Sequence, residues 1–310
     1  MSAVHRVAVV QASSTPFRAE PAVDKAVQLI AEAGAKGAKL ALFPEAFVGG
    51  YPKGCNFATP VGARLPGARD AYLSYFRGAI DVPGVETSRL AEAAAEAGVF
   101  VVIGVIERGG ATLYCTALFF DPQRGLVGKH RKVMPTAAER LIWGFGDGST
   151  LTAVDSAVGR VGSVICWENY MPMLRMAMYA KGVQIYCAPT ADDRDSWVPT
   201  MRHIAIEGRC FVLSACQHIR RAAYPDDYRC ELGDAPETLL MRGGSLIVSP
   251  LGEVIAGPNY EGETILTADI DLDDVVRGKY DLDVAGHYAR PDIFRLEVDT
   301  AEKPAVAATR

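Results

Sequence analysis

The sequence lacks the features of membrane-spanning, secreted and nucleic-acid-binding proteins. No stretch approaches the roughly 20 consecutive apolar residues that a membrane-spanning helix needs. The N-terminus has no charged segment followed by a long apolar one, as a signal peptide would have. Basic residues are not in excess, since the formal net charge is −5 over 310 residues. We therefore expect a cytoplasmic protein whose partner is neither nucleic acid nor a membrane, but a small molecule.

Paired cysteines of the structural or metal-binding kind are also missing. The seven cysteines are an odd number, contain no CxxC pair and show no Cys/His spacing typical of a zinc site. In a reducing compartment they are free thiols, and most free cysteines behave as small buried side chains. We expect no metal site, so the question becomes which cysteine is placed for chemistry.

Two common nucleophile systems are absent as well. None of the five histidines lies in a context that resembles a cysteine protease, and no GxSxG segment indicates a serine nucleophile. A thiol of ordinary pKa is mostly protonated at neutral pH, so a nucleophilic cysteine needs a base or a nearby cation. In this chain that partner has to be sought among residues other than histidine.

What the sequence does contain is an alternation of short apolar runs and amphipathic segments. With 49% hydrophobic residues it can bury a large core. No linker rich in Ser, Gly or Pro interrupts the alternation, which favours one α/β domain with helices on both faces. Hairpins are expected in the last third. Strands are predicted at 6–11, 40–43, 99–106, 114–120, 161–165, 184–187, 211–215, 245–248, 253–256 and 263–271, and helices at 23–33, 88–97, 171–180 and from 201.

Cys166 directly follows the apolar run Val161–Ile165, and a helix is expected a few residues later. A sharp turn from strand to helix exposes a side chain and directs backbone N–H groups at whatever binds there. This position suits a nucleophile and the anion that it generates. A buried cysteine at the end of a core strand is the alternative.

Two further segments carry candidate groups. Glu45 follows Phe43-Pro44 at the end of a predicted strand, where an apolar environment would raise its pKa and suit it to proton transfer. Taken alone, it could equally be an exposed loop residue. The run Lys129–Lys132 consists of four basic residues, which alone favours a solvated face or an anion-binding patch.

Together these segments resemble the three sequence blocks of the nitrilase superfamily of carbon–nitrogen hydrolases, in the family's order. Glu168 further resembles the nitrilase branch, because amidases and carbamoylases tend to follow their cysteine with an aromatic residue and an aspartate or similar. The segments Ser196–Phe211 and Arg242–Ser245 resemble the same branch. The three blocks are Phe43-Pro-Glu45, His130-Arg-Lys132 with Glu139-Arg140, and Cys166-Trp-Glu-Asn-Tyr170.

The resemblance implies a four-layer α-β-β-α sandwich in one carbon–nitrogen hydrolase domain, placed at residues 1–296. Residues 297–310 are polar and Ala-rich and are expected to form an extended or mobile tail. By the same resemblance, Cys166 is the nucleophile, Glu45 the general base and Lys132 the cation that stabilises the tetrahedral intermediate. Glu139 is a second carboxylate that holds Lys132 and the substrate in position. Lys132 is preferred to Lys129 because it matches the last position of the family's His-Arg-Lys element.

The implied activity is that of a nitrilase, which converts an organic nitrile to the carboxylic acid and ammonia through a covalent thioimidate and an acyl thioester. Nothing in these steps needs a metal, nucleotide or flavin cofactor. The resemblance also implies a homodimer or larger homo-oligomer. An aliphatic amidase or carbamoyl hydrolase with the same Glu-Lys-Cys triad is the nearest alternative. A non-enzymatic α/β interaction protein is the alternative from another class.

Other residues around the blocks have alternative interpretations. Trp167 and Tyr51 could line the substrate pocket, although core packing is as plausible for each. Asn169 is a candidate helix cap. The acidic stretch Asp192–Asp195 is expected to be a solvated loop rather than a metal site, because its carboxylates lack further ligands at a recognisable spacing.

Overall fold

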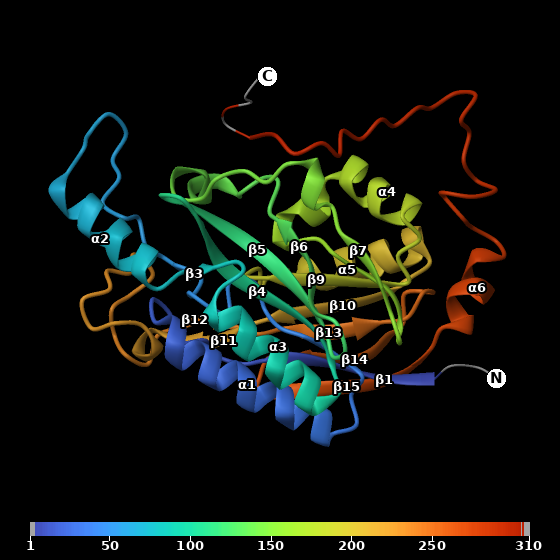
Figure 1. Cartoon of the computed structure of the whole chain (residues 1–310), viewed down its shortest axis with the longest axis horizontal. Helices are drawn as coiled ribbons and strands as arrows, with labels where there is room; N and C mark the ends of the chain where they lie inside the picture. The colour runs from blue at the N-terminus through green and yellow to red at the C-terminus, as the bar shows by residue number, and fades with distance from the viewer. Residues whose placement is uncertain (1–3, 305, 307–310) are drawn as a thin grey trace.

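The computed structural model of the chain describes residues 4–304 and 306, which form two packed β-sheets with helices on their outer faces (Figure 1). The first sheet is mixed: its N-terminal strands run parallel, and the later ones add antiparallel at both sides. In spatial order its strands are β15 (Thr264–Asp271), β1 (Val4–Gln11), β2 (Leu40–Leu42), β4 (Phe100–Gly109), β5 (Thr112–Asp121) and β6 (Gly125–Arg131), with β3 (Ile80–Asp81) paired to β4.

The second sheet has a parallel centre of three strands and antiparallel strands outside it. A separate two-stranded ribbon is formed by β11 (His218–Arg220) and β12 (Leu239–Arg242). In spatial order the second sheet contains β14 (Val254–Asn259), β13 (Ser245–Val248), β10 (Phe211–Cys216), β9 (Ile185–Thr190), β8 (Gly159–Ser163) and β7 (Ala153–Ser156).

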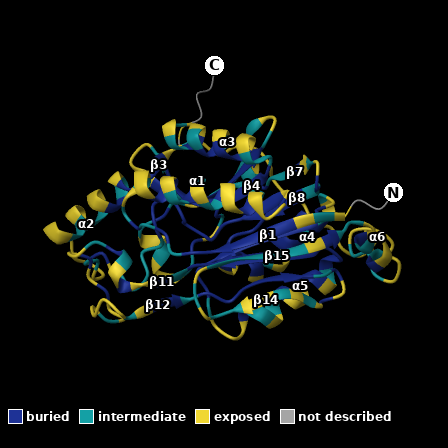
Figure 2. Cartoon of the chain, turned by 90° about the horizontal axis from the view of Figure 1, so that it is seen from below, coloured by how far each residue is buried: buried dark blue, intermediate teal, exposed yellow. Residues whose placement is uncertain are grey.

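Helices complete the outer layers. Apolar residues of α1 (Ala19–Ala35) and α3 (Val85–Ala97) pack on the first sheet, and those of α4 (Pro172–Ala180) and α5 (Trp197–Gly208) pack on the second. Figure 2 shows the strands buried and the outward sides of these helices exposed. The remaining helices are α2 (Pro66–Arg77) and α6 (Asp273–Lys279), with 3-10 turns η1 (Ala137–Leu141), η2 (Gly148–Thr150), η3 (Cys166–Tyr170) and η4 (Arg221–Ala223).

The core lies in three layers because each sheet is apolar on both of its faces. The central layer joins the two sheets, with Val9 and Leu42 of the first and Ile185 and Leu213 of the second in one apolar cluster. Every one of these side chains is fully buried. The predicted four-layer α-β-β-α sandwich is therefore confirmed.

Most of the predicted strands and helices are present. The structure also contains elements that the sequence pattern does not predict, among them β3, β6, β7, β11, β12 and α6, and three further differences concern β8, α2 and β15. The strand before Cys166 ends at Ser163, two residues earlier than predicted, because Cys166 begins the tight turn η3. The helix α2 is missing from the prediction, since its residues lack a clear apolar stripe and only Tyr75 is buried. The last predicted strand, β15, does not extend the hairpin but crosses to the first sheet and pairs with β1.

The position of β15 in the first sheet is determined by long-range contacts that the local sequence pattern does not predict. Eight residues of β15 pair in antiparallel register with β1, from Val4 opposite Asp271 to Gln11 opposite Thr264. Arg6 forms a bidentate ion pair with Asp269 on the exposed side, at 2.8 and 2.9 Å. This strand ties the C-terminal third of the chain to its N-terminus.

The structure also bears on the expected lack of a membrane-spanning helix and on the predicted C-terminal tail. None of the helices in residues 4–304 has the length and apolarity needed to cross a membrane. The described part of the tail is extended, and the backbone N–H of Lys303 donates to Asp147 Oδ2 at 2.7 Å. Residues 305 and 307–310 of the predicted tail lie outside the described residues.

Candidate active site

Glu45 lies just beyond β2, in a turn that neighbouring strands hold from two sides. Gln217 Nε2 donates to the backbone carbonyl of Glu45 at 3.1 Å. The backbone of Gly104 passes directly behind it, so a Cβ at that position would lie 2.4 Å from Pro44 O and 2.7 Å from the Cα of Glu45. Ala46 has a φ of +50°, a conformation that L-residues rarely adopt. These contacts direct the carboxyl group inward, and the residue is completely buried.

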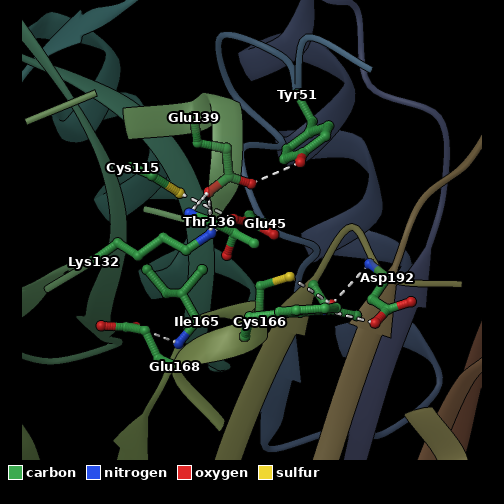
Figure 3. A network of polar contacts seen from close by, with 12 residues as sticks. Glu45, Tyr51, Cys115, Lys132, Thr136, Glu139, Ile165, Cys166, Glu168 and Asp192 are labelled. Atoms are coloured by element: carbon green, nitrogen blue, oxygen red, sulfur yellow. Dashed lines mark hydrogen bonds and ion pairs between the residues drawn. The ribbon is translucent and has the colours of Figure 1, made fainter. Parts of the chain in front are cut away.

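Lys132 reaches the same point from the end of β6. Its backbone N–H donates to Cys115 O at 2.8 Å, which fixes it beside β5. Its ammonium group donates to Glu45 Oε1 at 2.7 Å and to Glu139 Oε2 at 2.8 Å, with the lysine side chain fully buried (Figure 3). The basic run is therefore not one solvated face: alternate residues point to opposite sides, and Lys129 and Arg131 instead pair with Glu107.

Glu139 is held on the far side of the lysine by the first turn of η1. Its Oε2 accepts the backbone N–H of Thr136 at 2.6 Å, and its Oε1 accepts the hydroxyl of Tyr51 at 2.7 Å. Tyr51, Glu139 and Trp143 line a cavity of about 450 Å³. This geometry places Tyr51 at the cavity, one of the two positions considered for it.

Cys166 begins the turn η3 with a φ of +50°. A non-glycine residue in this conformation costs about 1–3 kcal/mol, and such strain is concentrated at functional sites. Its sulfur accepts a hydrogen bond from Thr190 Oγ1 at 3.2 Å, and the whole residue is only 4% exposed. Figure 3 shows the sulfur on the side that faces Glu45 and Lys132. The structure thus brings together Glu45, Lys132, Glu139 and Cys166, as the sequence predicts.

The charges of this cluster act on one another. Burial raises the pKa of Glu45, and the ammonium of Lys132 only partly offsets this. Burial alone would lower the pKa of Lys132, but the carboxylates of Glu45 and Glu139 and the Cys166 sulfur raise it well above its usual value. Burial and the charge of Glu45 raise the pKa of the Cys166 thiol. At neutral pH the lysine is therefore charged and the thiol keeps its proton.

Glu45 has one oxygen free to take that proton. Oε1 is occupied by Lys132, whereas the buried Oε2 has no hydrogen-bond partner among the described residues. The Cys166 thiol lies beside this carboxyl group and lowers its pKa, against the larger effect of burial. An unpaired carboxylate oxygen beside a protonated thiol is suited to general-base catalysis.

A second cysteine lies close to the cluster. Cys115 Sγ is 3.5 Å from Glu45 Oε1, but Cys115 lies within β5 opposite Ile106 and lacks the strained backbone of Cys166. Burial and the charge of Glu45 raise the pKa of its thiol. Proximity to the carboxylate alone does not distinguish the two sulfurs, whereas the position of Cys166 at a turn does. All seven cysteines lie in the described part of the chain and are free thiols.

Three residues that surround the cluster lie in different environments. In the acidic stretch that was expected to be solvated, Arg194 and Asp195 are exposed, but Asp192 is buried and accepts the indole N–H of Trp167 at 2.8 Å and the guanidinium of Arg194. Trp167 is 39% exposed with Arg194 over its ring, and it does not line the cavity beside Tyr51. Asn169 caps no helix, because its amide N donates to the carbonyls of Val164 and Cys166 inside the turn.

Sequence reasoning missed Thr190, which contacts the candidate nucleophile directly. Its hydroxyl oxygen accepts the backbone N–H of Asp192 at 2.9 Å, so its proton is free to point at the sulfur. Thr190 ends β9, the strand beside β8. The signal that could have found it is its place at the carboxyl end of a parallel strand next to the one that leads to Cys166.

Comparison with known proteins agrees with this arrangement. Residues 6–280 match the family model described as carbon-nitrogen hydrolase. The chain belongs to this family. A nitrilase of Bradyrhizobium diazoefficiens is 63% identical over 98% of this chain and 94% of its own length. An aliphatic nitrilase of Sinorhizobium fredii is 62% identical over 97% of each chain.

More distant members of the family are also similar to the chain. A bifunctional nitrilase/nitrile hydratase of Nicotiana tabacum is 53% identical, over 96% of this chain and 87% of its own. The crystal structure of Nit3 from Saccharomyces cerevisiae superposes with a TM-score of 0.69 at 21% identity, covering 94% of this chain and 97% of Nit3. The C. elegans NitFhit structure gives 0.72 at 20% identity, covering 98% and 69%. The predicted family and fold of this carbon–nitrogen hydrolase are confirmed.

Proposed function

We propose that this carbon–nitrogen hydrolase is a nitrilase that converts an organic nitrile to the carboxylic acid and ammonia, with Cys166 as nucleophile. The supporting observation is the convergence of a free carboxylate oxygen of Glu45, the ammonium of Lys132 and the strained Cys166 in one buried cluster. Two relatives above 60% identity are both named as nitrilases. Glu139 and Tyr51 support the lysine from the cavity side.

The first half of the reaction forms a covalent bond between sulfur and carbon. Glu45 Oε2 takes the thiol proton as Cys166 attacks the nitrile carbon, so the thiolate forms only as it is used. One π bond of the nitrile becomes a lone pair on nitrogen, and the developing charge is stabilised by the ammonium of Lys132. Transfer of the proton from Glu45 to that nitrogen gives the neutral thioimidate.

The second half consumes two water molecules. Glu45 removes a proton from the first water as it adds to the thioimidate carbon, and ammonia leaves after protonation of its nitrogen. The resulting acyl thioester is attacked by a second water, again with Glu45 as base. The carboxylic acid departs and the proton returns to the Cys166 sulfur. Every proton in this cycle passes through Glu45, which is why its unpaired oxygen matters.

Substrate contacts and assembly are further parts of the proposal. Tyr51 binds the substrate from the wall of the 450 Å³ cavity, and the exposed ring of Trp167, the residue after Cys166, makes a second substrate contact. The protein acts in the cytoplasm as a homodimer or larger homo-oligomer, with residues 1–296 as its catalytic domain.

The deciding experiment compares a nitrile panel and an amide panel with ammonia release as the readout. We expect the wild-type protein to act on nitriles and Cys166→Ala to release no ammonia while keeping the wild-type circular dichroism spectrum. Mass spectrometry of trapped enzyme should find the adduct on the peptide of Cys166 and not on that of Cys115. Turnover of nitriles by Cys166→Ala would contradict the nucleophile assignment. Ammonia from amides alone would make the protein an amidase.

A further inference from the structure

Glu168 contacts the chain neighbours of both Lys132 and Cys166. Its Oε1 accepts the backbone N–H of Val133, the residue after Lys132, at 2.6 Å. Its Oε2 accepts the backbone N–H of Ile165, the residue before Cys166, at 2.8 Å. The lysine follows β6 of the first sheet and the cysteine follows β8 of the second. One carboxylate therefore bridges the two sheets at the point where their reactive residues emerge.

The same carboxylate pairs with His130 on β6. His130 Nε2 lies 2.9 Å from Glu168 Oε2, and His130 Nδ1 lies 3.0 Å from the backbone carbonyl of Thr150. The carbonyl can only accept, so Nδ1 carries a hydrogen. The Glu168 carboxylate accepts two backbone N–H groups and, when ionised, can only accept. Its contact with His130 is therefore a hydrogen bond only if Nε2 of that ring also carries a hydrogen. Both side chains are fully buried, and Glu168 raises the pKa of His130 against the effect of burial.

We infer that Glu168 and the imidazolium of His130 form a buried ion pair that positions the ammonium of Lys132 against the sulfur of Cys166. The inference rests on the proposed function and deepens it, because neither residue touches the reacting atoms. Three donors converge on the two oxygens of Glu168, from Val133, Ile165 and His130. A neutral amide would present its NH₂ to one of these donors and leave a buried N–H group unsatisfied.

The test is Glu168→Gln, which keeps the size of the side chain and removes its charge. A matched control is Glu107→Gln. Glu107 is equally buried and pairs with Lys129 and Arg131 of β6, but within residues 4–304 none of its side-chain hydrogen bonds reaches the turn of Cys166. Both variants lose a buried carboxylate that is paired to β6, so both should unfold at a lower temperature. A merely structural role for Glu168 predicts the same kinetic result for both.

We expect the two variants to differ in turnover. For Glu168→Gln, kcat per titrated active site should fall by about 10- to 100-fold, because a small misplacement of reacting groups is costly. Its KM should change by less than about threefold, since substrate contacts remain. Glu107→Gln should keep the wild-type kcat per active site. Equal kcat values for Glu168→Gln and wild type, or equal losses in the two variants, would overturn the inference.

Two readouts do not depend on nitrile turnover. The rate of alkylation of Cys166 by iodoacetamide, followed by peptide mapping, should change in Glu168→Gln and not in Glu107→Gln. In the wild type, ¹⁵N spectra of labelled histidine at pH 8 should show a doubly protonated ring that is absent from His130→Gln. A neutral His130 at this pH, or unchanged alkylation in Glu168→Gln, would refute the ion pair. Absence of ammonia release by the wild type would refute the proposed function instead.

Discussion

At the scale of single residues, the site depends on how charge is distributed among four side chains. Two carboxylates flank one ammonium, so a thiolate at Cys166 would add a further negative charge to a buried cluster that is already anionic. The raised pKa of the thiol follows from burial and from the charge of Glu45. The neutral thiol is therefore the stable resting form, and the reaction begins with proton transfer to Glu45 during attack.

Replacement of the cation tests this distribution. Lys132→Ala removes the only ammonium hydrogen-bonded to Glu45 in residues 4–304 and leaves two buried carboxylates without compensation. We expect kcat/KM for nitrile hydrolysis to fall by at least about 100-fold, the usual loss when a donor to a developing anion is removed. Lys129→Ala is the control, because this partly exposed lysine pairs with Glu107 outside the cluster. Loss of activity in the control alone would mean that the cation was assigned to the wrong residue.

The pH dependence of the rate should report Glu45. A base must be ionised to accept a proton, and burial raises the pKa of this carboxyl group above the ordinary value of 4.5. The acid limb of kcat/KM should therefore have its midpoint above pH 4.5, and activity should be lost as the pH falls through it. Rates measured on protein shown by circular dichroism to be folded would check this. A rate that stays constant to below pH 4.5 would argue against Glu45 as the base.

Residue types and strand ends alone predict Cys166 and Glu45 as candidates, whereas Lys132 and Glu139 follow only from the resemblance to the nitrilase superfamily. The burial of Asp192 could not be predicted. An acidic stretch looks the same in sequence whether it faces water or a tryptophan N–H. Thr190 was missed because its contact with Cys166 requires β9 to lie beside β8, which is a property of the folded sheet.

At the scale of elements, the candidate base is positioned by a close approach between β4 and the turn after β2. Gly104 donates its backbone N–H to Pro44 O at 3.2 Å and accepts from Val48 N at 3.1 Å. No side chain fits between these backbones, as the 2.4 Å approach to Pro44 O shows. The register of β4 thus determines how far the carboxyl group of Glu45 extends into the cluster.

Gly104→Ala should disturb this turn. The added methyl group overlaps the backbone of residues 44–46, which should reduce the free energy of unfolding by about 1–3 kcal/mol, as overpacking does. Turnover of folded enzyme should also fall, because Glu45 is displaced. Gly67→Ala in α2 is the control, since its Cβ would meet nothing within 4 Å. Denaturant titration and kcat of both variants would measure this, and a fully active Gly104→Ala would disprove the positioning role.

The positions of long apolar strands followed well from the sequence, since β4 and β10 lie at the predicted 99–106 and 211–215 to within three residues. Which strands pair with one another could not be predicted from these apolar runs. β15 was predicted as part of a hairpin region, and only its register with β1 and the ion pair of Arg6 with Asp269 reveal where it belongs. Such pairings bring together residues more than 250 positions apart, which local patterns do not encode.

At the scale of the whole molecule, the C-terminal segment leaves apolar side chains uncovered. Tyr288, Ile293, Phe294 and Leu296 are exposed along the stretch of turns and irregular structure beyond α6, which runs over the outside of the molecule (Figure 1). Exposed apolar side chains in a contiguous stretch are typical of association surfaces. We expect light scattering after size exclusion to give at least twice the mass of one chain. A monomer at micromolar concentration would contradict the predicted homo-oligomer.

The central apolar layer has a consequence for where changes in activity should arise. Glu45 and Lys132 follow strands of one sheet, whereas Cys166 and Thr190 lie at strand ends of the other. A small shift of one sheet relative to the other would therefore change the distance between base and nucleophile without altering either residue. Side chains packed between the two sheets, such as Leu42 and Ile185, therefore help to set this distance. Variants selected for a changed turnover rate should include substitutions in this apolar layer, at positions that no substrate contacts.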